Sequence, residues 1–271
     1  MLNKNCAVEG CIWIMPKLDE KRQDTDSRNI LLDIIHTTEH EETLNPDSIL
    51  DLGCGPGNST KVLKDRFPNA RVIGADNSNE MLEKAKKLYP EIDFINLDAN
   101  GDLNDISEKF DIVFSNACIQ WLPNHRELLP KLMTLLKPDG ILAIQIPIQR
   151  EHPVHIIINQ LSENQNWNGK IVPRQYNNLS TEEYFDVLSH ISSDFEIWET
   201  TYCHRMPSYE SIIEWYKGTG LKPYLEQLSE SEANEFIDDV YIELQQRYQV
   251  QKNGEILFRF PRLFFMVKNN C

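Results

Sequence analysis

Short apolar runs alternate with segments of helical character in the first 150 residues. Buried strands are predicted where apolar residues run together, at 49–52, 71–76, 92–99, 110–117 and 141–147. Helices are predicted over 29–36, after a cap near Ser78 or Asn79, and over 125–136 despite Pro130. Because strands separated by helices pair in parallel, this rhythm predicts an α/β doubly wound sheet with helices on both faces.

The regular alternation of strands and helices ends at Pro147. Further helices are predicted at 154–165 and 180–190, and further strands at 195–206 and 255–267. Between these two strands, residues 208–248 hold two or three amphipathic helices, which we expect to cap the carboxyl edge of the sheet. The predicted organisation is an arm (1–28), a ligand-binding core (29–150) and a C-terminal part (151–271) whose cap spans about 208–250.

Charge and composition narrow the class of partner. The chain has 271 residues, 41% of them hydrophobic, and a formal net charge of −15, so a polyphosphate is repelled and nucleic acid is not expected as a partner. No apolar run reaches the length of a membrane helix or a secretory signal core, which favours a cytoplasmic protein. The six cysteines lack metal-ligand spacing, so we expect free thiols and no metal site.

A glycine turn follows the first strand. Gly53, Gly55 and Gly57 stand directly after the apolar run, and Ser59 or Thr60 is expected to cap the next helix. A strand, a glycine turn and a helix together let a nucleotide-like ligand lie against bare backbone.

Two ligand classes compete for this turn. The nicotinamide fingerprint G-x-G-x-x-G fails at its sixth position, which is Asn58. Asp51, in the strand before the turn, suits a ligand with an ammonium group and no phosphate. Asp76 and Asp98 end the next two strands, where they can accept hydrogen bonds from ribose hydroxyls and from an adenine amino group. These acids favour S-adenosylmethionine over a nicotinamide cofactor.

Five segments resemble the ordered motifs of class I S-adenosylmethionine-dependent methyltransferases: ILDLGCGPGNST, GADNSNEMLEKAKK, NLDAN, FDIVFSNACIQWLPNH and LLKPDGILAIQIP. GPGNST, QWLPNH, WYKGTGLKPYL and NGEILFRFPRLFFMV are similar to the trans-aconitate 2-methyltransferase family, and the resemblance covers about residues 48–268. It implies a Rossmann-like, mostly parallel, seven-stranded sheet with an antiparallel last strand, and methyl-ester formation on a small polycarboxylic acid. The candidate cofactor-binding residues are Asp51, Gly53, Gly55, Gly57, Asn58, Asp76, Asn77, Asp98, Ala99 and Asn116.

The chain departs from the family pattern in its arm. The family carries W-[DN]-P-x-x-Y-x-x-F there, and in related methyltransferases this arm helps to cover the cofactor. Here Trp13 is followed by Ile14, Met15 and Pro16, and the Tyr and Phe are absent.

Methyl transfer to a carboxylate needs no general base, because the nucleophile is already ionised at neutral pH. We therefore predict no catalytic residue in the strict sense, only alignment by binding, and expect His125, His152, His155 and His204 to be structural or surface groups. The carboxylates that stay unmethylated need cationic anchors, for which the candidates are Arg259, Arg262, Lys217 and Lys222, with Gln120 and Trp121 near the methyl position. Strict alternation puts Arg259 and Arg262 on opposite faces of their strand; a bulge at Pro261 would let both converge.

Two alternatives remain open at this stage. The acceptor can be another small molecule or an acid held on a carrier protein. The chain can also be a non-catalytic module that binds S-adenosylmethionine, an alternative that the altered arm keeps open. The sequence does not indicate the oligomeric state.

Overall fold

The computed structural model describes residues 45–101, 103, 106–218 and 220–270. The predicted arm (1–28) and the helix expected over 29–36 lie outside the described residues. In the part of the chain that is described, no helix combines the length and the apolar character needed to cross a bilayer.

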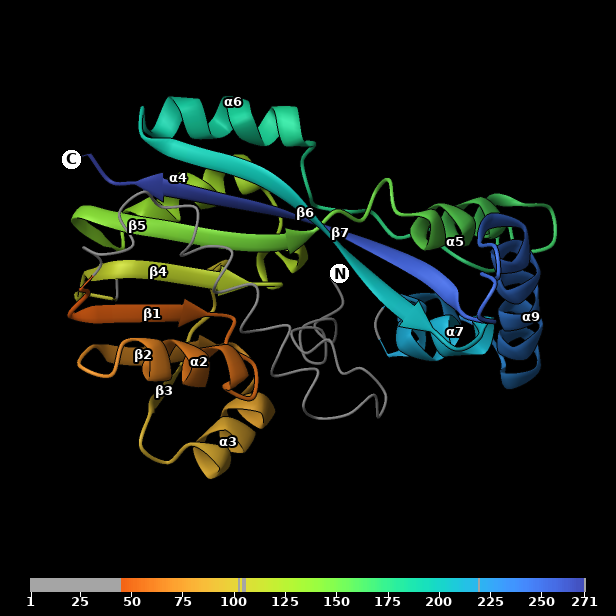
Figure 1. Ribbon diagram of the computed structural model, residues 1–271, viewed down its shortest axis with the longest axis horizontal. Coiled ribbons are helices and arrows are strands. Elements are labelled where there is room, and N and C mark those ends of the chain that lie inside the picture. The colour runs from red at the N-terminus through yellow and green to blue at the C-terminus, as the bar shows by residue number, and fades with distance from the viewer. Residues whose placement is uncertain (1–44, 102, 104–105, 219, 271) are drawn as a thin grey trace.

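Seven strands form one sheet, in the order β3-β2-β1-β4-β5-β7-β6. Their bounds are β1 (Ser48–Leu52), β2 (Arg71–Asp76), β3 (Asp93–Asn96), β4 (Phe110–Asn116), β5 (Leu136–Pro147), β6 (Phe195–Met206) and β7 (Ile256–Lys268). Strand β7 is antiparallel to both of its neighbours, and the other described pairs are parallel. The mostly parallel, doubly wound sheet with an antiparallel last strand is confirmed (Figure 1).

Helices cover both faces of the sheet because alternate strand residues point to opposite sides. Leu50 and Leu52 of β1 pack in one core with α4 (His125–Met133) and α6 (Thr181–Ile191). Ile49 belongs to a second core with α2 (Asn58–Arg66). Helix α3 (Asn79–Leu88) packs beside β3 and starts where expected, since the Ser78 hydroxyl accepts a hydrogen bond from the Met81 N–H at 3.3 Å.

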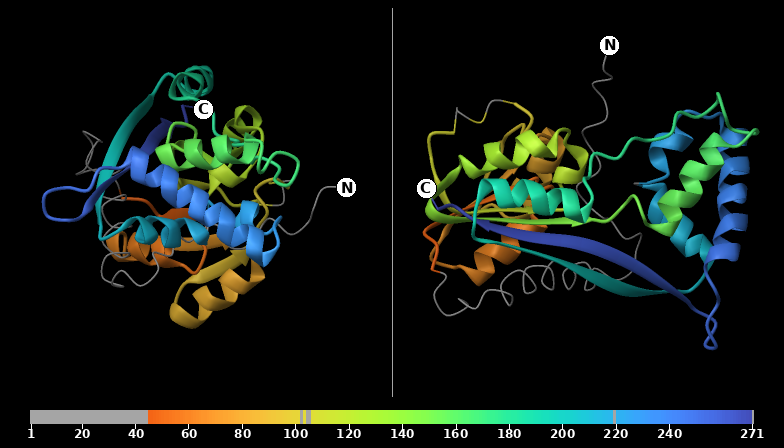
Figure 2. Two further views of the ribbon diagram at one scale, coloured as in Figure 1. Left: turned by 90° about the vertical axis from the view of Figure 1, so that its right-hand side faces the viewer. Right: turned by 90° about the horizontal axis from the view of Figure 1, so that it is seen from above.

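A helical cap stands beyond the carboxyl ends of the parallel strands (Figures 1 and 2). It comprises α5 (Pro153–Glu163), α7 (Tyr209–Lys217), α8 (Lys222–Leu225) and α9 (Glu230–Arg247). These helices share an apolar core with Phe258 and Phe260 from the first half of β7. The cap is therefore larger than the segment 208–250, because the apolar face of α5 packs against α9. The long strands β6 and β7 link the cap to the main sheet.

Candidate active site

The glycine turn between β1 and α2 has left-handed backbone at Gly53, Gly55 and Gly57, with φ of 76°, 54° and 89°. The N–H groups of Gly53 and Cys54 both donate to the Ala75 carbonyl of β2, at 2.7 and 3.0 Å. A Cβ at Gly53 would lie 2.1 Å from Cys118 Sγ. The turn therefore holds its shape only without a side chain at Gly53.

Asp51 is fully buried at the end of β1. Its Oδ2 accepts hydrogen bonds from Ser59 Oγ at 2.7 Å and Thr60 Oγ1 at 2.6 Å, whereas Oδ1 has no partner among the described residues. Burial raises the pKa of Asp51 to about 6, and the two hydroxyls oppose that rise. A buried carboxylate with one vacant acceptor atom is suited to an ammonium group.

The prediction that Ser59 or Thr60 caps α2 is wrong. Gly57 occupies the N-cap position, and no side chain caps the helix. Ser59 and Thr60 lie inside the first turn of α2, and their hydroxyls donate to the buried carboxylate of Asp51 instead of accepting from the N–H groups of the helix.

Asp76 lies buried at the end of β2 and fixes the turn from the other side. Its Oδ2 accepts from the Gly55 N–H at 2.9 Å, and its Oδ1 accepts from the Ser78 N–H at 2.8 Å. Because each carboxylate oxygen has two acceptor positions, Asp76 can still accept hydrogen bonds from a ligand.

The remaining candidate cofactor residues lie at the same edge. Asp98 and Asn77 are exposed, and Ala99 is buried just beyond β3. Asn58 accepts a hydrogen bond from Tyr89 Oη at 3.3 Å. Asn116 ends β4 with a buried Oδ1 that has no partner among the described residues.

These residues fit S-adenosylmethionine. Bare backbone, a buried acceptor on Asp51 and a second on Asn116 match a ligand that has an ammonium group, a ribose and an adenine but no phosphate. Among the described residues, no three His, Cys, Asp or Glu side chains gather as a metal site.

A second group of polar residues stands at the carboxyl end of the sheet, and we call Gln120, Trp121, Gln145 and Arg262 the edge cluster: Gln145 and Arg262 are hydrogen-bonded to each other, and Gln120 and Trp121 belong to the short helix that follows β4. The chain leaves β4 through Ala117 at φ 52° and enters the short helix η1 (Ile119–Trp121). Gln120 is buried, and its Nε2 donates to the Ala117 carbonyl at 2.6 Å. Within the described part of the chain, no hydrogen-bond partner is present for Gln120 Oε1, Trp121 Nε1 or Gln145 Nε2. Buried polar atoms of this kind need a partner, which water or a polar ligand can supply.

Arg262 joins the edge cluster from β7, and Arg259 does not. Arg262 is 8% exposed, and its Nη1 donates to Gln145 Oε1 at 3.2 Å. Arg259 is exposed. The β6–β7 register runs on without a shift through Pro261, so the two arginines stay on opposite faces and the bulge considered from the sequence is absent there.

Lys217 and Lys222, the other expected anchors, lie on the cap in surface ion pairs. Lys217 pairs with Glu214, and Lys222 Nζ lies 3.8 Å from Glu226 Oε1. The structure does not bring these lysines into the edge cluster.

The structure adds residues that sequence reasoning missed. Arg174, in the segment between α5 and α6, places its guanidinium carbon 4.1 Å from the centre of the Trp121 ring. Gln145 interrupts an apolar strand, which was a usable sign of an inward polar group, whereas nothing in the sequence around Arg174 distinguishes it from a surface arginine.

Two of the histidines also lie in this region, buried at the start of the cap. Tyr216 Oη is 3.2 Å from His152 Nδ1, and Tyr176 Oη is 2.7 Å from His155 Nδ1. Burial lowers the pKa of His152 to about 4 and that of His155 well below its usual value, so both rings are neutral at pH 7. The interpretation of these histidines as structural fits their hydrogen bonds.

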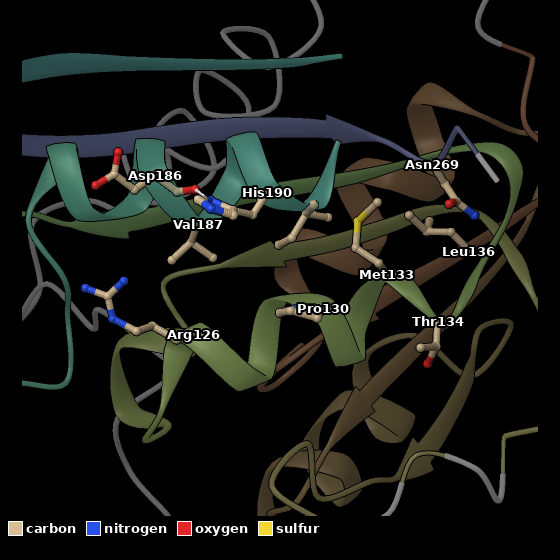
Figure 3. A pocket seen from close by; sticks show the side chains of 10 residues that line it. Arg126, Pro130, Met133, Thr134, Leu136, Asp186, Val187, His190 and Asn269 are labelled. Atoms are coloured by element: carbon tan, nitrogen blue, oxygen red, sulfur yellow. Dashed lines mark hydrogen bonds between the residues drawn. The ribbon is translucent and has the colours of Figure 1, made fainter. Parts of the chain in front are cut away.

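A separate groove of about 740 Å³ runs between α4 and α6 (Figure 3). Its lining is Arg126, Pro130, Met133, Thr134, Leu136, Asp186, Val187, His190, Ile191 and Asn269. Leu136 begins β5 and Asn269 follows β7, so the groove reaches the opposite edge of the sheet from the glycine turn. It does not belong to the candidate active site.

Comparisons with known proteins agree with this geometry. A family model described as "Methyltransferase domain" matches residues 49–140. Trans-aconitate 2-methyltransferases of Escherichia coli O157:H7 and Shigella flexneri are each 39% identical over 224 residues, 83% of this chain and 87% of the relative. The solved structure of YcgJ from Bacillus subtilis superimposes with a TM-score of 0.60 at 17% identity, covering 91% of this chain and 99% of that one. The plantazolicin methyltransferase BamL, crystallised with S-adenosylhomocysteine, gives a TM-score of 0.53 at 18% identity and covers 93% and 88%.

The sheet order, the glycine turn and the acids at the strand ends define an S-adenosylmethionine-dependent methyltransferase. Identity of 39% over most of the chain then places it within that class: the chain belongs to the trans-aconitate 2-methyltransferase family.

Proposed function

We propose that this protein transfers the methyl group of S-adenosylmethionine to a carboxylate of a small polycarboxylic acid, with trans-aconitate as the first candidate. The observation that carries the proposal is the buried guanidinium of Arg262, set beside Gln145 next to η1 at the carboxyl edge of the sheet. A buried arginine with hydrogen-bonding neighbours is a natural anchor for a carboxylate. The names of the relatives support the choice of acid.

We assign the cofactor-binding roles to the strand ends. Asp51 receives the ammonium group on its vacant Oδ1, and the glycine turn with the start of α2 receives the carboxylate of the amino acid. Asp76 accepts the ribose hydroxyls, and Asp98 with Ala99 borders the adenine. Asn116 lies on the side of the reacting methyl group.

The cofactor supplies an electrophilic methyl group on its sulfonium. The acid arrives as its carboxylate, because carboxyl pKa values lie near 4, so the chain needs no group to remove a proton. Arg262 and Gln145 hold a carboxylate that does not react, and this leaves another directed at the methyl group. Well-oriented reactants are worth up to about 7–11 kcal/mol, so alignment accounts for most of the rate.

Cofactor binding should depend on pH through Asp51. Burial raises its pKa to about 6 in the cofactor-free protein, and an ammonium partner favours the ionised form. Binding therefore releases a proton at low pH, and we expect the affinity for S-adenosylhomocysteine to rise about tenfold from pH 5 to pH 7. Calorimetric titrations of the wild-type protein and of Asp51→Asn measure this effect. The variant should bind more weakly at pH 7 and lose the pH dependence; the same slope in both proteins would contradict the assignment of Asp51.

The acceptor is tested with purified protein and a panel of acids that carry one, two or three carboxylates. Formation of S-adenosylhomocysteine gives kcat/KM for each acid, and we expect trans-aconitate to be among the best acceptors. If no free acid is methylated but a carrier-bound acid is, the acceptor class is wrong. If S-adenosylhomocysteine binds and nothing is methylated, the chain is a binding module.

A further inference from the structure

We infer that the acceptor pocket recognises a hydroxyl group, so that a polycarboxylic acid with a hydroxyl binds more tightly than the same acid without it. The recognising groups are the side-chain oxygens of Gln120 and Asn178. The inference rests on the proposed function, because it specifies the class of acid that the proposed reaction methylates.

The orientation of both side-chain amides is fixed by their nitrogen atoms. Gln120 Nε2 donates to the Ala117 carbonyl at 2.6 Å, and Asn178 Nδ2 donates to the Pro147 carbonyl at 2.9 Å. Because a carbonyl only accepts hydrogen bonds, each amide must turn its nitrogen toward the carbonyl and its oxygen away from it. The two side chains are 1% and 4% exposed, and neither Gln120 Oε1 nor Asn178 Oδ1 has a hydrogen-bond partner among the described residues. Both oxygens are therefore buried acceptors that need a donor.

The two amides bind backbone groups that are neighbours at the carboxyl edge of the sheet. The N–H of Ala117, directly after β4, donates to the Gln145 carbonyl of β5 at 2.9 Å. Carbonyls two residues apart on a strand point to the same side, so the Pro147 carbonyl that holds Asn178 is also directed toward the end of β4. Gln120 binds the carbonyl of Ala117 itself. Both side chains are therefore anchored where β4 ends beside β5.

A second set of hydrogen bonds holds the segment before α6 against η1. His125 Nε2 lies 2.8 Å from the Ile119 carbonyl, and His125 Nδ1 lies 2.5 Å from Tyr184 Oη of α6. Gln120 follows Ile119 in η1, and Asn178 stands just before α6. The two amides therefore come from segments that are bonded to each other as well as to the end of β5, and their oxygens share one region of the site.

A carboxylate does not satisfy these two oxygens, because an ionised carboxylate has no hydrogen to donate. A hydroxyl does: it is neutral, its hydrogen can be shared between two acceptors, and its burial costs far less than burial of an ammonium group. The same edge carries two buried donors, Trp121 Nε1 and Gln145 Nε2, which have no partner in the described part of the chain and suit carboxylates. The polar atoms together therefore match an acid that carries a hydroxyl beside its carboxylates.

The direct test compares acids that differ only in one hydroxyl: malate with succinate, and citrate and isocitrate with propane-1,2,3-tricarboxylate. Calorimetric titration into the complex with S-adenosylhomocysteine gives a Kd for each acid. We expect one of the hydroxy acids to bind at least about tenfold more tightly than its parent acid, because the parent leaves buried acceptors without a donor. If no hydroxy acid binds more tightly than its parent, the inference is wrong.

Gln120→Met removes the acceptor oxygen and keeps the length of the side chain, so it should reduce the preference for the hydroxy acid to less than about threefold. Gln160→Met, on the exposed side of α5, is the matched control and should keep the full preference. A variant that only disturbs the fold weakens both acids of a pair equally, so an unchanged ratio of Kd values in Gln120→Met would overturn the inference. Should Gln120→Met fail to fold, Asn178→Ala is the second variant and is judged by the same ratio.

The outcomes separate this inference from the proposed function. A preference for the hydroxyl in binding, without methylation of any acid, would overturn the proposed reaction and leave the hydroxyl site standing. Methylation of trans-aconitate with no gain from a hydroxyl in any pair would overturn the inference and leave the reaction standing, with water as the partner of the two oxygens. Tighter binding of aspartate than of malate would show a site for an ammonium group and would also overturn the inference.

Discussion

Replacing Gly53 with alanine is expected to weaken binding of S-adenosylhomocysteine at least 100-fold. The new Cβ would lie 2.1 Å from Cys118 Sγ and 2.3 Å from Cys118 Cβ, so rotating the cysteine side chain does not relieve the contact. The turn must move instead, and with it the two N–H groups that donate to the Ala75 carbonyl. The left-handed backbone at φ 76° adds about 1 kcal/mol of strain for any residue with a Cβ. Calorimetry with S-adenosylhomocysteine measures the loss.

Gly254→Ala is the matched control for this change. Gly254 has φ 83°, and a Cβ there meets nothing within 4 Å, so the variant carries the backbone strain without the clash. It should lose about 1 kcal/mol of unfolding free energy and bind S-adenosylhomocysteine like the wild type. Should Gly53→Ala fail to fold, Gly57→Ala, whose Cβ would lie 2.8 Å from Phe94 Cζ, serves as the second variant. A folded Gly53→Ala variant that binds S-adenosylhomocysteine with wild-type affinity would contradict the role of the glycine turn in cofactor binding.

Replacing Arg262 with alanine is expected to reduce kcat/KM for the acid at least 30-fold. Removing one partner of a buried, hydrogen-bonded charge costs about 2–5 kcal/mol, and about 1.4 kcal/mol corresponds to a factor of ten. The Arg262 side chain is 8% exposed and bonds to Gln145, so the variant loses its anchor in a site that water enters poorly. Steady-state kinetics with trans-aconitate measures the effect.

Arg259→Ala, three residues earlier on the same strand, is the control. Arg259 is exposed, and its contact with His152 uses its backbone carbonyl, which alanine retains. This variant should keep kcat/KM within about twofold. Both variants should bind S-adenosylhomocysteine like the wild type, which separates loss of the acid anchor from damage to the fold. If the two variants lose the same activity, Arg262 does not anchor the acid.

The sheet was predictable because local pattern and global fold agree in this chain. Each apolar run of the core became a strand, and Ser78 capped its helix as expected, but two bounds were wrong: β5 begins at Leu136, within the helix expected over 125–136, and β3 is shorter than the strand expected over 92–99. Residues 195–206 were also placed correctly as a strand, although half of that strand leaves the main sheet to support the cap. The spacing of apolar residues shows which residues are buried, and burial of these residues stabilises the strands and helices of the core.

The details of the site were less predictable because they depend on contacts far apart in sequence. Ser59 and Thr60 looked like helix caps, but the buried carboxylate of Asp51 holds both hydroxyls. The alternation of side chains along a strand predicted that Arg259 and Arg262 point to opposite faces. The structure was needed to show that the pairing of β7 with β6 is uninterrupted there and that Arg262 is the buried one. Arg174 is brought to Trp121 by the return of its segment from the cap, which leaves no local sequence pattern.

The most direct test of the central claim is the chemistry of the methylated product. The protein is incubated with trans-aconitate and S-adenosylmethionine carrying an isotopically labelled methyl group, and the product is treated with mild alkali. We predict a labelled monomethyl ester that releases all its label as methanol. Label that stays attached to carbon or nitrogen after alkali, or no transfer to the acid, would contradict the account.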